Sequence, residues 1–202
     1  MHDPLPRLTD MTGIILAGGK SSRMGGNDKA FLKFRGKSMI ERTMEIFRDL
    51  FPEILIVTNS PLEYLSFDCR IVTDMVKGKG ALGGIFSGLT FASSEHCFVT
   101  ACDLPFLNGD FIRFMAQRAR EVDIVVPLCE DGFQPLHAFY SRRLIPAMER
   151  MIRDDLLKIS PLFKKSRTLV LSGEILSRFG GEERMFLNVN SQEDLDRALS
   201  RS

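Results

Sequence analysis

Short apolar runs alternate along this chain with longer stretches whose apolar positions recur every three or four residues. The short runs predict buried strands, because they have strand length and are bounded by turn-forming residues. These strands are expected at residues 13–17, 54–58, 70–72, 97–101, 123–127 and 168–171. The alternation of strand and helix signals indicates βα repeats.

The longer stretches predict amphipathic helices over residues 39–51, 110–122, 141–155 and 192–199. The first has the clearest boundaries. Ser38 is a good N-cap, Glu41 stands three residues later as a capping box requires, and Pro52 ends the helix. Helix-length connections between strands favour a mostly parallel sheet with both faces covered, which is an α/β fold.

The chain is expected to form one domain over residues 11–202, preceded by a flexible tail at 1–10 that is polar and broken by prolines. A length of 202 residues suits a single core. In sheets of this kind, ligands bind beyond the carboxyl ends of the strands. Residues just after each predicted strand are therefore the first candidates for chemistry.

A glycine-rich loop follows the first predicted strand, over residues 16–29. Glycines let backbone N–H groups approach a phosphate chain closely, and the cations Arg23 and Lys29 would neutralise its charge. The spacing matches neither the P-loop nor the dinucleotide-binding fingerprint. The loop therefore predicts a nucleoside triphosphate site of another kind.

Two aspartates stand just beyond predicted strands. Asp103 follows the strand at 97–101 and precedes Pro105, so it is either a turn residue or a ligand for Mg²⁺ bound to phosphate oxygens. The neighbouring glycine loop favours the Mg²⁺ ligand. Asp74 holds the equivalent place after the strand at 70–72, and a role in a turn or cap explains it equally well.

Three further segments are open to two interpretations. The stretch 78–89 holds several glycines and is either a ligand-binding loop or a tightly packed helix start. His137 lies in a mixed polar and aromatic stretch, where a buried structural histidine is the commoner case. Asn188 and Asn190 share one face if extended, and Asn190 also suits an N-cap.

Composition narrows the class of protein. The chain has 27 Lys and Arg against 26 Asp and Glu, so its net charge does not favour binding to nucleic acid or to an anionic membrane. No apolar run reaches membrane-spanning length. The four cysteines show no C-x-x-C spacing, so a zinc site is not expected. Cys97 and Cys102 bracket an apolar strand and are expected to be buried thiols, which favours the reducing cytoplasm.

The ordered motifs resemble the MobA family of molybdenum cofactor guanylyltransferases from about residue 13 to residue 199. The motifs are Leu-Ala-Gly-Gly at 16–19, Arg-Met-Gly-Gly at 23–26, Asp-Lys at 28–29, Asp-Leu-Pro at 103–105, Gln-Pro-Leu-His-Ala-Phe-Tyr at 134–140 and Asn-Val-Asn at 188–190. The first motifs mark the wider nucleotidyltransferase superfamily, and the later ones narrow it.

The resemblance implies a Rossmann-like three-layer sandwich that binds GTP with Mg²⁺ and transfers GMP to molybdopterin, releasing pyrophosphate. It implies catalytic roles for Arg23, Lys29 and Asp103, with Asp103 also holding the metal. It also implies that the remaining ligand-binding residues are Leu16, Ala17, Gly18, Gly19, Asn59 and Asp74 on the nucleotide side and His137, Asn188 and Asn190 on the pterin side.

Two alternatives stay open at this stage. One is a related nucleotidyltransferase with another base or acceptor, such as a cytidylyltransferase acting on molybdopterin or an enzyme acting on a sugar or alditol phosphate. The other is a non-catalytic nucleotide-binding domain that docks on molybdoenzymes or their chaperones, which are candidate partners of the enzyme as well. The presence of Arg23, Lys29 and Asp103 argues for an enzyme.

Overall fold

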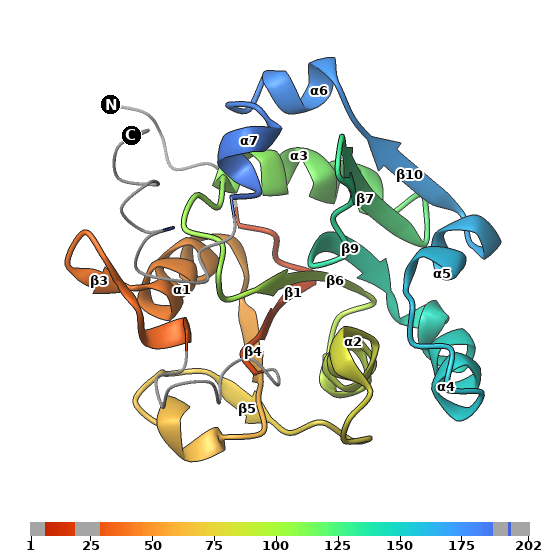
Figure 1. The fold of residues 1–202 in the computed structure, drawn as a ribbon, viewed down its shortest axis with the longest axis horizontal. Coiled ribbons are helices and arrows are strands. Elements are labelled where there is room, and N and C mark those ends of the chain that lie inside the picture. The colour runs from red at the N-terminus through yellow and green to blue at the C-terminus, as the bar shows by residue number, and fades with distance from the viewer. Residues whose placement is uncertain (1–6, 19–28, 188–193, 195–202) are drawn as a thin grey trace.

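The computed structural model describes residues 7–18, 29–187 and 194. Within this part of the chain, eight strands form one sheet in the order β10-β7-β9-β6-β1-β4-β5, with β8 beside β7 (Figure 1). They are β1 (Met11–Leu16), β4 (Glu53–Val57), β5 (Arg70–Val72), β6 (His96–Ala101), β7 (Ile124–Cys129), β8 (Gly132–Phe133), β9 (His137–Ser141) and β10 (Thr168–Leu171). A separate hairpin pairs β2 (Lys33–Phe34) with β3 (Lys37–Ser38).

Helices cover both faces of the sheet (Figure 1). The α-helices are α1 (Met39–Leu50), α2 (Gly80–Phe91), α3 (Gly109–Ala119), α4 (Ile145–Arg153), α5 (Ser160–Lys165), α6 (Glu174–Ser177) and α7 (Glu182–Met185). Short 3-10 turns lie at η2 (Lys29–Phe31), η3 (Pro61–Tyr64) and η4 (Arg142–Leu144). The expected helix at 192–199 falls outside the described residues except for Asp194.

All six expected strands are present, and two of them, β5 and β10, have the expected bounds. The pairs β1–β4, β1–β6, β4–β5 and β7–β10 are parallel, which confirms the mostly parallel α/β fold. The expected helix over 141–155 is shorter, because η4 precedes α4 and only Ile145–Arg153 is α-helical. The sequence reasoning did not foresee β9.

Strand β9 lies between β6 and β7 and runs antiparallel to both. Its side chains alternate between the two faces of the sheet. Phe139 joins one apolar cluster, whereas Ala138 and Tyr140 join the other. This alternation is what a strand buried on both faces requires, but it spans too few residues for periodicity to separate it from a loop.

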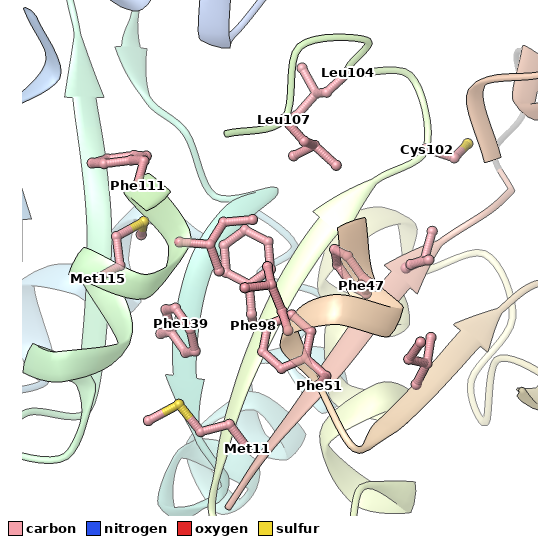
Figure 2. Packing of buried hydrophobic residues seen from close by; sticks show 14 of the residues in the cluster. Met11, Phe47, Phe51, Phe98, Cys102, Leu104, Leu107, Phe111, Met115 and Phe139 are labelled. Carbon is pink, nitrogen blue, oxygen red and sulfur yellow. The ribbon is translucent and has the colours of Figure 1, made fainter. Parts of the chain in front are cut away.

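The two apolar clusters form two cores, one on each face of the sheet. On the face covered by α1 and α3, Phe98 of β6 packs against Phe47, Phe51 and Phe139 with ring centroids 5.1–6.1 Å apart (Figure 2). On the other face, α2 and α4 bury a second cluster against the alternate residues of the same strands. The described chain is therefore a three-layer sandwich.

Close packing of α1 on β1 depends on a glycine. A Cβ added at Gly13 would lie 2.6 Å from ring atoms of both Phe47 and Phe51. The expected capping box at the start of α1 is also confirmed, since the Ser38 hydroxyl accepts from the Glu41 N–H and the Glu41 carboxylate accepts from the Ser38 N–H at 2.6 Å. These local features fix where α1 begins and how near it approaches the sheet.

Of the N-terminal segment expected to be flexible at 1–10, the structure describes residues 7–10. The Leu8 N–H donates to the Leu50 carbonyl at 2.8 Å, and Asp10 forms an ion pair with Arg120 at 2.7 Å. Leu8 and Asp10 are therefore both held against the sandwich. Within the described ranges, no helix is long and apolar enough to cross a membrane.

Candidate nucleotide-binding site

The ends of four neighbouring strands bring the candidate residues of the nucleotide site to one edge of the sheet. Leu16 pairs in register with Val57 and with Ala101, and Val57 pairs with Val72. Each of these is the last residue of its strand. The residues two positions beyond them are Gly18, Asn59, Asp74 and Asp103, in every case a predicted site residue.

Asn59 and Asp74 meet directly across the ends of β4 and β5. The Asn59 side-chain amide donates a hydrogen bond of 2.8 Å to Oδ2 of Asp74. Asn59 is exposed and Asp74 is half-buried, so the pair faces solvent at the edge of the sheet. The amide oxygen of Asn59 and the second carboxylate oxygen of Asp74 remain able to accept hydrogen bonds from a ligand.

The glycine loop starts beside this pair. A Cβ built at Gly18 would lie 3.8 Å from the Asn59 backbone nitrogen, so the chain after β1 passes directly over the end of β4. The Ala17 N–H donates to the Val57 carbonyl at 2.9 Å and continues the parallel pairing of β1 with β4 up to the loop. Ala17 and Gly18, which lead into the loop, are thus held against the end of β4.

Helix α2 packs against Leu16 and Asp74 of the candidate site. A Cβ at Gly84 would lie 3.3 Å from the Leu16 side chain and 3.8 Å from Oδ1 of Asp74. The Ser87 hydroxyl accepts from the Met75 N–H at 2.9 Å and fixes the backbone just after Asp74. The glycine-rich stretch at 78–89 is therefore a close-packed helix that also lines the site.

The start of α2 is tied to the end of α4. Lys79, the N-cap residue of α2, forms an ion pair of 2.8 Å with Asp155. Asp155 has a φ of 56°, which places it in the left-handed region. Sequence reasoning did not identify this pair, because its two residues are 76 positions apart and Asp155 belongs to no motif.

Asp103 lies half-buried just beyond β6, on the same edge as Gly18. Its carboxylate is of the kind that Mg²⁺ prefers, and one or two such groups together with phosphate oxygens make a usual Mg²⁺ site. The described residues contain no group of three or more His, Cys, Asp or Glu that could hold a metal by themselves. Asp103 therefore fits a metal that is shared with a phosphate ligand.

His137 occupies a different environment from the residues at the strand ends. Its side chain is 1 % exposed and lies against the rings of Phe98, Phe111 and Phe186, with centroids 5.0, 5.7 and 5.1 Å away. Neither ring nitrogen has a hydrogen-bond partner among the described residues. Desolvation lowers the pKa of His137 to about 3, so the ring is neutral at physiological pH.

The remaining predicted site residues are only partly covered by the structure. Arg23, Gly19, Asn188 and Asn190 lie outside the described residues, and of Lys29 only the backbone at the start of η2 is described. The predicted residues that gather at the strand ends are Leu16, Ala17, Gly18, Asn59, Asp74 and Asp103. His137 is buried at the start of β9, paired with Thr100 of β6.

All four cysteines are free thiols, and the expected burial of Cys97 and Cys102 is confirmed. Cys97 and Cys102 are buried, and burial raises the pKa of the Cys97 thiol to about 12. Such a thiol is protonated at neutral pH and packs as a small apolar group.

A mostly parallel sheet that gathers Gly18, the Asn59–Asp74 pair and Asp103 at the carboxyl ends of its strands has the arrangement of a ligand-binding α/β domain. Comparison with known proteins agrees. Residues 13–166 match the MobA-like NTP transferase domain. The chain belongs to this family and is a nucleotidyltransferase.

Relatives cover almost the whole chain. A molybdenum cofactor guanylyltransferase of Desulfosudis oleivorans is 36% identical, covering 93% of this chain and 94% of its own. A probable molybdenum cofactor guanylyltransferase of Peptoclostridium acidaminophilum is 37% identical over 91% of this chain and 86% of its own. The crystal structure of molybdopterin-guanine dinucleotide biosynthesis protein A from Archaeoglobus fulgidus superposes with a TM-score of 0.79 at 26% identity, covering 95% of this chain and all of that one.

Proposed function

We propose that this chain transfers GMP from GTP to molybdopterin carrying molybdenum, releasing pyrophosphate. Full-length relatives named molybdenum cofactor guanylyltransferase support the reaction. The observation that carries it in this chain is the placement of Gly18, Asn59, Asp74 and Asp103, each two residues beyond the end of its strand on one edge.

In this reaction a phosphate oxygen of the acceptor forms a bond to the α-phosphorus of GTP. The bond from that phosphorus to the oxygen bridging to the β-phosphate breaks, and pyrophosphate leaves with that electron pair. The attacking oxygen is already anionic at neutral pH, so no strong general base is needed. Positioning of the two phosphates and neutralisation of their charge are the main tasks of the protein.

The glycine loop would hold the triphosphate. Leu16, Ala17 and Gly18 lead the chain over the strand ends, and Gly19 continues it. Arg23 and Lys29 would neutralise the phosphate oxygens that become the leaving pyrophosphate.

Asp103 would hold Mg²⁺ against the phosphates. When bound, Mg²⁺ withdraws charge from the oxygens around the α-phosphorus and so stabilises the transition state. The half-buried Asp103 suits this role, because it follows the end of β6, which pairs with the end of β1 where the glycine loop begins.

Asn59 and Asp74 would read the base. Guanine presents N–H donors at N1 and N2, and the carboxylate of Asp74 accepts such bonds, while Asn59 fixes that carboxylate through the 2.8 Å hydrogen bond. Asn188 and Asn190 would contact the pterin. The ring of His137 is buried, so we propose that it supports the pterin side by packing within β9 and not by touching the pterin from an exposed position.

The test is a transfer assay with the purified chain, Mg²⁺, molybdopterin and each of GTP, CTP and UTP. We expect pyrophosphate release and dinucleotide formation with GTP, at least tenfold faster than with CTP. A preference for CTP would identify a cytidylyltransferase instead. Nucleotide binding without pyrophosphate release from any of the three would identify a non-catalytic domain.

A further inference from the structure

A cavity of about 430 Å³ opens between the start of α1, the turn that follows Asp103 and the segment from α6 to α7. This volume lies within the usual range of small-molecule sites. The candidate nucleotide-site residues Gly18, Asn59, Asp74 and Asp103 are not among its described lining residues. Its described lining residues are Arg42, Ile46, Pro105, Phe106, Leu107, Asn108, Gly109, Phe179, Gly180, Arg184 and Met185.

Two arginines of this lining are held in place by two aromatic rings. The Arg42 guanidinium carbon lies 5.0 Å from the centre of the Phe34 ring, and that of Arg184 lies 5.3 Å from the centre of the Phe106 ring. The two rings meet edge to face with centroids 5.5 Å apart. Stacking on aromatic faces restrains a guanidinium while leaving its N–H groups at the rim free to donate.

These cations have no acidic partner. Within the described part of the chain, neither Arg42 nor Arg184 forms an ion pair or a hydrogen bond with a carboxylate. The Nε atom of Arg42 is buried without a hydrogen-bond partner. A buried donor left unpaired costs free energy unless a ligand satisfies it.

A third arginine stands behind the cavity wall. Nη1 of Arg113 would lie 3.4 Å from a Cβ added at Gly109, and its Nε is also buried without a partner. Among the described residues, Arg113 forms its ion pair with the exposed Asp110, at 3.4 Å. Arg113 therefore adds a third positive charge beside Gly109 of the cavity lining.

We propose that this cavity is a second anion site, which binds the phosphate group of a small molecule next to the nucleotide site. Paired guanidinium groups bind phosphate oxygens through charge-assisted and often bidentate hydrogen bonds. Phe106 and Phe179 supply an apolar wall for a ring attached to that phosphate. The chemistry fits two sources, the phosphorylated heterocyclic acceptor and free pyrophosphate.

The position of the cavity favours a role in the reaction. Pro105 and Phe106 of its wall follow Asp103 by two and three residues, so a ligand in the cavity contacts the same turn that carries the metal-suited carboxylate. The assignment of the acceptor as occupant rests on the proposed function, whereas the anion site itself does not.

The experiment measures ligand affinity by isothermal titration for the wild type and for Arg42→Gln/Arg184→Gln. Molybdopterin and inorganic pyrophosphate are titrated separately while a GTP analogue with a methylene group between its α- and β-phosphates, added with Mg²⁺, saturates the nucleotide site. The analogue cannot transfer GMP, and neither ligand is counted at the nucleotide site. We expect the double variant to bind at least one of them tenfold or more weakly than the wild type. Arg48→Gln is the matched control, since Arg48 is exposed near the other end of α1.

The separate titrations of molybdopterin and pyrophosphate distinguish the possible ligands. Weakened binding of molybdopterin assigns the acceptor, and weakened binding of pyrophosphate alone assigns the product. Equal affinities of wild type and double variant for both ligands, or no binding of either to the wild type, overturn the site. Titration of Mg-GTP alone tests the nucleotide site, so its failure would count against the proposed function instead.

Folding of the variants is checked by circular dichroism and thermal unfolding. Arg42→Lys serves as a second variant, because it keeps the charge and loses the planar fork. We expect it to fold like the wild type and to bind with an affinity between those of the wild type and the double variant. Wild-type affinity in the double variant with full folding would leave no role for the two guanidinium groups.

Discussion

The side chain of Asn59 holds the carboxylate of Asp74 through a 2.8 Å hydrogen bond, although the two residues follow different strands. The contact depends on the parallel pairing of β4 with β5, in which Val57 stands beside Val72. Two residues further on, both chains have left the sheet and their side chains meet above its edge. The pair that we propose to read the base is thus brought together by sheet register and not by a local motif.

Loss of this pair should weaken GTP binding and base selection together. We expect Asp74→Asn to lose about tenfold or more in affinity for GTP, since a charged acceptor contributes roughly 1.5–3 kcal/mol to a hydrogen bond. Affinity for CTP should change less. Titration of both nucleotides checks this, with Asp49→Asn on the exposed side of α1 as the control. Unchanged GTP affinity in Asp74→Asn would remove the pair from base recognition.

Asp103 should control turnover more than nucleotide binding. We expect Asp103→Ala to lower the rate of pyrophosphate release by roughly a hundredfold or more, because stabilisation of transition-state charge is worth several kcal/mol. Lys29→Ala should lose most turnover for the same electrostatic reason. Addition of a chelator to the wild type should reproduce the loss, and excess Mg²⁺ should reverse it. A folded Asp103→Ala protein with near-normal transfer would refute the metal assignment.

His137 should make the fold sensitive to acid. Its pKa is about 3 in the folded protein and near 6.5 when unfolded, so the unfolded state binds the proton more readily. The free energy of unfolding should therefore be unaffected by this ring above pH 6.5 and should fall as the pH drops from 6.5 toward 3. At pH 5 the loss should be about 2 kcal/mol.

Urea unfolding at pH 5 and pH 7 measures this effect. His137→Leu has a side chain of similar volume without a titratable group, so its free energy of unfolding should change less between the two pH values. Paired acids such as Asp10 and Asp123, whose pKa values are lowered by Arg120 and Arg167, contribute equally to both proteins. The same pH dependence in wild type and variant would show that His137 is not the cause.

Gly13 should tolerate no side chain. We expect Gly13→Ala to lower the free energy of unfolding by roughly 1–3 kcal/mol, because its Cβ would overlap the rings of Phe47 and Phe51 at 2.6 Å. Gly18→Ala is the comparison, since its nearest neighbouring atom would be 3.8 Å away. Chemical denaturation of both variants checks the contrast. Equal stabilities would mean that α1 shifts to make room at little cost.

Much of the fold followed from local patterns. The six strands first expected from apolar runs all formed, and the Ser38–Glu41 capping box began α1 where it was expected. The aspartates after β5 and β6 were noticed because polar groups at strand ends face the ligand edge of a parallel sheet. Such signals are readable because each spans a few neighbouring residues.

Other features required the tertiary structure. Strand β9 is inserted antiparallel between β6 and β7, and that placement, not its own short sequence, buries His137 among phenylalanines. The Lys79–Asp155 pair and the cavity between Arg42 and Arg184 join segments far apart in the chain. Local hydrophobic periodicity does not predict such contacts, because they form only when elements far apart in the sequence pack together.

By itself, the sequence determined the α/β class, the positions of its main strands and the residues at the strand ends, because hydrophobic period and turn chemistry are local properties. Strand register and helix packing decided the rest. They brought Asn59 to Asp74, placed His137 in the core rather than at the site edge, and put two arginines at a cavity with no carboxylate among its described lining residues. Long-range pairing and packing set these relationships, and they exist only in the folded chain.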